Sequence, residues 1–115
     1  MRITIISLTI LLMSACFARG GVSGARVEHL DAVVAQVHEA VMATLQAEEI
    51  AIEEESVDRQ ASLVKGRYAD GVRVTIHATR FSERVTRITI QVGSFGDAQR
   101  SGLLMDGIQG RLPGS

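Results

Sequence analysis

Three histidines are the residues of this sequence best suited to metal binding or proton transfer. His29 and His38 are nine residues apart in a segment with helical periodicity, so at about 100° per residue they would point in opposite directions. His77 falls on the outward face of an expected strand, with no second ligand at metal-site spacing. The spacing therefore predicts exposed histidines and no metal or cofactor site. The alternative is a small hydrolase or lyase that uses His77 with Arg87 or Thr75 on an open sheet face.

An acidic cluster is followed by a basic stretch in the middle of the chain. The cluster could bind Ca²⁺ weakly through carboxylate oxygens; its members are Glu48, Glu49, Glu53, Glu54, Glu55 and Asp58. The basic residues after it are Arg59, Lys65, Arg67, Arg73, Arg80, Arg84 and Arg87. Because the cluster lacks a Gly-punctuated ligand loop, we expect cross-strand ion pairs on a solvated sheet face instead. A second possibility for the basic strands is contact with anionic lipid headgroups.

The segment 93–97, G-S-F-G-D, precedes an expected helix and could bind an anion through backbone N–H groups. Asp97 already supplies negative charge there, and Ser94-x-x-Asp97 is similar to a capping box. We therefore expect a structural turn, with Phe95 filling the gap between sheet and helix. The chain contains no H-E-x-x-H, G-x-S-x-G or phosphate-loop pattern, and we expect a protein without enzymatic activity.

The first 15 residues have the composition of a secretory signal peptide. Arg2 is followed by an apolar run over residues 3–13 and then by Ser14 and Ala15, which are small. The run is shorter than the roughly 20 residues that a membrane-spanning helix needs. We therefore expect residues 1–15 to be a cleaved signal rather than a membrane-spanning segment.

Cys16 is the single cysteine of the chain, and the sequence M-S-A-C that ends with it resembles the lipobox of bacterial lipoproteins. The resemblance implies that Cys16 receives a diacylglyceryl thioether, that the leader is cut before it, and that the new amino group is acylated. Several acyl chains would anchor the domain stably in a membrane. Because Phe17 and not Asp follows Cys16, the resemblance favours the outer over the inner membrane, facing the periplasm, if the source has two membranes. The alternatives are cleavage after Ala18 and an unmodified thiol in an uncleaved leader.

The remaining chain is long enough for one small domain. We expect residues 16–25 to hold the lipidated Cys16 and a flexible Gly-rich tether, and residues 26–113 to form a single α+β domain. The chain has three Phe, one Tyr, no Trp and a formal net charge of −1. With few aromatic faces for stacking bases and no basic excess, we expect no nucleic-acid partner.

Hydrophobic periodicity predicts the elements that position these residues. Apolar residues recur every three or four positions over 26–47, which predicts a helix. Alternation predicts strands at 50–53, 61–68, 72–78 and 86–92, although the pattern does not decide the buried face of 61–68. A last helix would carry Ser101, Leu104, Ile108 and Leu112 on one face and end before Pro113. The expected fold is α+β: an N-terminal helix, a four-stranded antiparallel meander and a C-terminal helix, with both helices on one sheet face.

These features together resemble a family of small bacterial lipoproteins of unknown function. The resemblance covers residues 27–112 and rests on the lipobox, the amphipathic helix, the A-D-G turn and V-G-S-F-G-D, followed four residues later by Ser101. It implies the fold and the membrane address and adds no chemistry. From the anchor, the short tether and the absence of a catalytic motif, we expect a non-enzymatic envelope module. Its sheet face or helix edge would bind an envelope protein or a cell-wall component.

Overall fold

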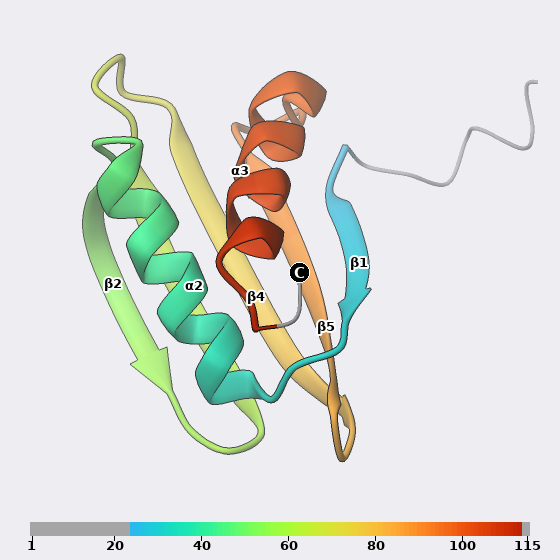
Figure 1. Cartoon of the computed structure of the whole chain (residues 1–115). Helices are drawn as coiled ribbons and strands as arrows, with labels where there is room; N and C mark the ends of the chain where they lie inside the picture. The colour runs from blue at the N-terminus through green and yellow to red at the C-terminus, as the bar shows by residue number, and fades with distance from the viewer. Residues whose placement is uncertain (1–23, 114–115) are drawn as a thin grey trace, which may run out of the picture.

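A mixed set of strands and helices makes up residues 24–113, which are the residues described by the computed structural model. Cys16, the leader and most of the expected tether lie outside the described residues. The elements are β1 (Arg26–Leu30), α2 (Val34–Ala47), β2 (Ala51–Val57), β3 (Ala61–Arg67), β4 (Arg73–Ser82), β5 (Val85–Val92) and α3 (Ala98–Gly110). Both helices lie on the same face of one sheet (Figure 1).

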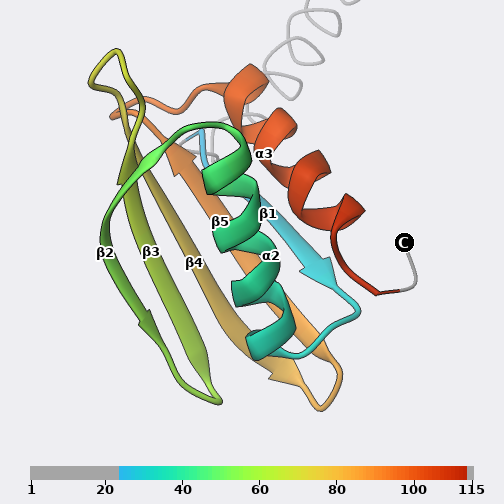
Figure 2. The same cartoon turned by 60° about the vertical axis from the view of Figure 1, so that its left-hand side comes forward.

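The sheet has five strands in the order β1-β5-β4-β3-β2, and every neighbouring pair is antiparallel. Strands β2 to β5 follow one another as a meander, and β1 pairs with the free edge of β5 (Figure 2). The α+β class is as predicted, but the predicted sheet of four strands after an N-terminal helix is wrong. The sheet has a fifth strand, β1, because the chain enters the sheet before its first helix.

The expected helix over 26–47 begins eight residues later than predicted, at Val34. Val27 and Leu30 have the spacing of a helical stripe, yet they lie on opposite faces of β1, where Val27 is 50% exposed and Leu30 is buried. In β1 they pair with Thr89 and Thr86 of β5. This pairing satisfies the backbone N–H and C=O groups of β5 that would otherwise form an open sheet edge. A tertiary contact therefore decides the conformation of β1.

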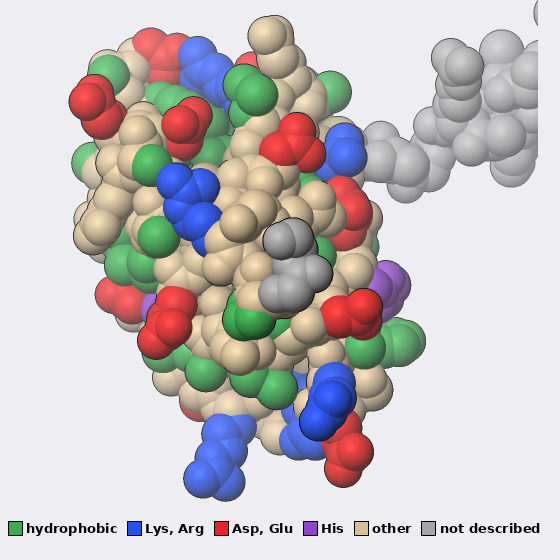
Figure 3. All heavy atoms as spheres, in the orientation of Figure 1, with side chains coloured by type: hydrophobic (Ala, Val, Ile, Leu, Met, Phe, Trp, Pro, Cys, Tyr) green, Lys and Arg blue, Asp and Glu red, His purple; other side chains and the backbone are tan. Residues whose placement is uncertain are grey.

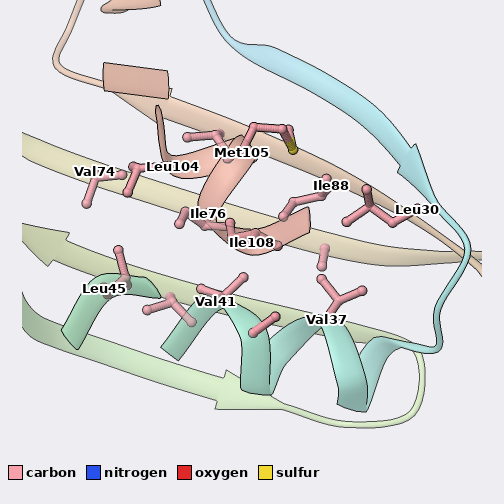
Figure 4. Packing of buried hydrophobic residues seen from close by; sticks show 14 of the residues in the cluster. Leu30, Val37, Val41, Leu45, Val74, Ile76, Ile88, Leu104, Met105 and Ile108 are labelled. Carbon is pink, nitrogen blue, oxygen red and sulfur yellow. The ribbon is translucent and has the colours of Figure 1, made fainter. Parts of the chain in front are cut away.

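The core lies between the central strands and the two helices. Alternate residues of β4 and β5 point toward the helices, and α2 and α3 meet them with residues spaced three or four apart (Figure 4). The fully buried side chains include Val37, Val41 and Leu45 of α2, Val74 and Ile76 of β4, Ile88, Ile90 and Val92 of β5, and Leu104, Met105 and Ile108 of α3. Neither α2 nor α3, the two helices of residues 24–113, covers the opposite face of the sheet (Figure 1).

Strand β3 buries the face that carries Ser62 and Val64 and leaves Leu63, Lys65 and Arg67 on the open side. Strand β2, which pairs with β3 at the edge of the sheet, runs to Val57, four residues beyond the predicted strand at 50–53. The register of this pairing shifts between Ile52 and Glu54. Most of β2 is exposed, because it is an edge strand at the margin of the helix layer.

The turn before α3 differs from the prediction in two respects. Asp97 is itself the N-cap of α3 and accepts a hydrogen bond from the Arg100 N–H at 3.0 Å, so the expected box starting at Ser94 is not formed. Phe95 is 93% exposed and does not fill the gap between sheet and helix. That space is occupied by residues of α3, including Leu104 and Met105.

Gly107 lets the two helices approach each other closely. A Cβ at this position would lie 2.9 Å from the Cγ2 atom of Thr44 in α2, which is closer than side chains pack. The glycine lowers the intrinsic helix propensity of α3, and packing against α2 compensates for this. Among the described residues, neither helix has the length and apolar character to cross a membrane.

Candidate functional site

A buried histidine connects α2 to the two strands beneath it. The Nδ1 atom of His38 lies 2.7 Å from Ser62 Oγ in β3, and its Nε2 atom lies 2.6 Å from Glu55 Oε2 in β2. The prediction of an exposed His38 is therefore wrong. Its position directly after Val37 places it at the margin of the apolar stripe, and the sheet extends far enough beneath α2 to bury it.

Serine, histidine and a carboxylate are also the groups of a nucleophilic catalytic triad. Because a carboxylate can only accept, Nε2 of His38 must donate to Glu55; in the neutral imidazole, Nδ1 then accepts from the Ser62 hydroxyl. Ser62, however, is only 2% exposed, so its oxygen cannot reach the carbonyl carbon of a substrate. The arrangement is a structural link between α2, β2 and β3.

The other two histidines are exposed, as predicted. His29 makes an edge-to-face contact with Phe81, with ring centroids 4.6 Å apart. His77 shares the open sheet face with Thr75 and Arg87, but no hydrogen bond or ion pair joins it to either of them. Within residues 24–113 no group of three or more His, Cys, Asp or Glu side chains could hold a metal ion.

The expected cross-strand ion pairs are present on the open face. Arg67 Nε lies 3.1 Å from Glu53 Oε2, and Lys65 Nζ lies 4.0 Å from Glu54 Oε1, so β3 neutralises two of the carboxylates of β2. Such exposed pairs stabilise a fold by only about 0–1 kcal/mol each. Their main effect here is to neutralise the charges that β2 and β3 place on the open face of the sheet.

The remaining acidic residues of the predicted cluster are dispersed. Glu55 faces the helix layer, and Glu48 and Glu49 lie in the turn after α2. Asp58 accepts hydrogen bonds from the backbone N–H groups of Gln60 and Ala61, which lowers its pKa. The cluster is therefore divided between two turns and the two faces of β2, and it does not converge on one point.

Two arginines line a pocket of about 280 Å³ beside the first turn of α2. Arg59 comes from the β2–β3 turn and Arg80 from β4, and within the described chain neither side chain forms an ion pair. Glu83 lines the same pocket and brings a negative charge to it. The positive potential expected from a helix N-terminus and two arginines is thus partly cancelled.

At the other end of the sheet, Arg100 of α3 connects the β3–β4 turn to the helix layer. Its Nη2 atom lies 2.6 Å from Asp70 Oδ2, and its guanidinium lies over the ring of Tyr68, 4.4 Å from the centroid. The hydrogen bonds from Arg100 lower the pKa of the Asp70 carboxyl, whereas burial raises the pKa of Tyr68. Elsewhere on the helix-bearing side, acidic and basic side chains are interspersed (Figure 3).

Comparison with known proteins identifies the family but no chemistry. Residues 1–111 match the model of a family described as "Protein of unknown function (DUF3568)". Because the match covers nearly the whole sequence, the chain belongs to this family. No curated protein matches the chain significantly.

The geometry around His38 predicts that the loss of one hydrogen-bond partner lowers the free energy of unfolding more than the loss of the other. Ser62→Ala leaves the buried Nδ1 atom without a partner and should lower the free energy of unfolding by about 1–3 kcal/mol. Glu55→Gln keeps a side-chain oxygen that can accept from Nε2, and the Glu55 side chain is 44% exposed. This variant should lower the free energy of unfolding by only about 0–1 kcal/mol. Urea denaturation of the two variants beside the wild type measures the difference. Equal losses, or labelling of Ser62 in the folded protein by a serine-reactive fluorophosphonate, would contradict a purely structural link.

Proposed function

We propose that this family member is a lipoprotein of the bacterial cell envelope, anchored through lipid on Cys16 and acting as a non-enzymatic binding or structural module. The observation that carries the proposal is M-S-A-C at residues 13–16, preceded by a basic start and an apolar run. The family match begins at residue 1 and so includes this segment, which supports treating it as part of the family pattern.

The proposed location is the periplasmic side of the envelope. Phe17 occupies the position where Asp commonly retains lipoproteins at the inner membrane, so we favour the outer membrane for a source with two membranes. A Cys16 with several acyl chains would hold the domain at the bilayer far more firmly than one chain could.

The open sheet face is the surface that we propose for binding. It carries His77, hydroxyl groups such as those of Thr75 and Thr89, and the compensated ion pairs of β2 and β3. This combination suits a polar contact with an envelope protein or a cell-wall component. An enzyme that uses His77 has less support, because the imidazole lacks a partner among the described residues that would orient it for proton transfer.

A contact of the basic strands with anionic headgroups also has less support. Lys65 and Arg67 are already paired with carboxylates. Arg59, Arg80 and Arg84 lie at the end of the sheet remote from Gly24, where the described chain begins. The tether from Cys16 would enter the domain at the Gly24 end.

Lipidation of Cys16 predicts the outcome of membrane fractionation. The wild type should sediment with membranes, resist washing with salt and carbonate, and dissolve in detergent, whereas Cys16→Ser should be soluble once its apolar leader is removed. The matched control is Cys16→Ser combined with Ser23→Cys, which keeps one thiol in the chain but moves it, and which should also be soluble. A soluble wild type, or a Cys16→Ser variant that stays in the membrane after its leader has been removed, would contradict the anchor.

Binding through the open face predicts position-dependent cross-linking in intact cells. A photoreactive amino acid at His77 should give a reproducible adduct, and mass spectrometry of that adduct would identify a protein or a cell-wall fragment. The same amino acid at Glu39, which is exposed on the helix side, is the matched control and should give none. Adducts from Glu39 alone, or from neither position, would count against this surface.

A further inference from the structure

The most exposed large apolar side chain of the described residues lies beside the start of the described chain. Phe95 is 93% exposed and belongs to the turn between β5 and α3. An aromatic side chain of this size is normally buried, because exposing it to water forgoes the hydrophobic stabilisation that burial provides. Its exposure leaves an aromatic surface available for contact with a second apolar phase.

The backbone of Gly24 is packed directly against the turn that carries Phe95. Gly24 and Gly96 both have a φ of +83°, a conformation that other residues adopt at a cost. A Cβ on Gly24 would lie 2.4 Å from the Phe95 carbonyl oxygen, and a Cβ on Gly96 would lie 2.6 Å from the Gly24 Cα. Only glycine at both positions permits this approach, which fixes Phe95 next to the place where the tether would join the domain.

The length of chain before Gly24 decides which end of the domain would lie nearer the membrane. From Cys16 to Gly24 a fully extended chain spans at most roughly 29 Å. Strand β4 has 10 residues and is therefore about 33 Å long. The Gly24 end would stay close to the bilayer, whereas the turns that carry Arg59 and Arg84 lie at the opposite end (Figure 2).

We infer that Phe95 inserts into the headgroup region of the membrane that holds the lipid of Cys16, as a second, apolar contact between the domain and the bilayer. This inference rests on the proposed lipidation. Phenylalanine is one of the apolar side chains that interfacial protein segments bury at the boundary between lipid headgroups and acyl chains.

The charges at the same end indicate that the contact is apolar and not electrostatic. Arg73, whose carbonyl accepts from the Gly93 N–H at 2.8 Å, forms no ion pair within the described chain and could meet a lipid phosphate. Glu48 and Glu49 lie at this end as well and offset its positive charge. The insertion should therefore occur in zwitterionic membranes and be insensitive to salt.

The chain contains no tryptophan, so a single introduced indole reports its own surroundings without background. The full-length protein carrying Phe95→Trp, extracted with detergent from the cells that produce it, is reconstituted into phosphatidylcholine vesicles, with and without brominated acyl chains. The matched control is Phe81→Trp, which replaces a 63% exposed phenylalanine near the opposite end of the sheet. Brominated lipid should quench the emission of the Phe95→Trp protein on the order of twofold and leave that of the Phe81→Trp protein unchanged.

Sedimentation of the same samples separates the two proposals. If both variants sediment with vesicles and neither is quenched, the anchor stands and the insertion of Phe95 is wrong. Equal quenching of both variants also overturns the inference, because the domain would then have no preferred orientation. If the Phe95→Trp emission is already blue-shifted in the Cys16→Ser form in buffer without lipid or detergent, that side chain is covered by a second copy and not by lipid. If neither variant sediments, lipid anchoring and insertion both fail.

Discussion

The restriction of apolar side chains to one face of the sheet is the constraint on which the rest of this structure depends. Alternation in β4 and β5 directs Val74, Ile76, Ile88 and Ile90 to the same side, and a surface of that size must be covered to remain folded in water. The stripes of α2 and α3 supply the cover. The described residues contain no cysteine, so packing without disulfides holds them together.

The same constraint explains the polar features. Because the helices cover one face, His38 of α2 is brought over β2 and β3 and must find partners there, which Ser62 and Glu55 provide. The uncovered face can carry the paired charges of β2 and β3 in solvent. Under the proposed anchoring, the strands would run away from the bilayer, so that the open face would be accessible from the side and the arginine-lined pocket would lie at the distal end.

The sequence predicted those parts of the fold in which a local pattern and the tertiary structure agree. Strands β4 and β5 alternate strongly and were predicted to within a few residues, whereas β1 was missed because two apolar residues three apart fit a helix equally well. Its conformation is set by β5, far along the chain. The burial of His38 and the exposure of Phe95 could not be predicted either. The first depends on how far the sheet extends beneath α2, and the second on a Gly24–Gly96 contact that no local pattern signals.

The proposed lipid on the sulfur of Cys16 is tested most directly on the amino-terminal peptide of the protein extracted from membranes with detergent. Mass spectrometry of this peptide should find Cys16 as the first residue, with the added mass of a diacylglyceryl group and of an acyl group on the amino nitrogen. A peptide with an unmodified Cys16 still joined to the leader, or one that begins after Ala18, would contradict the account.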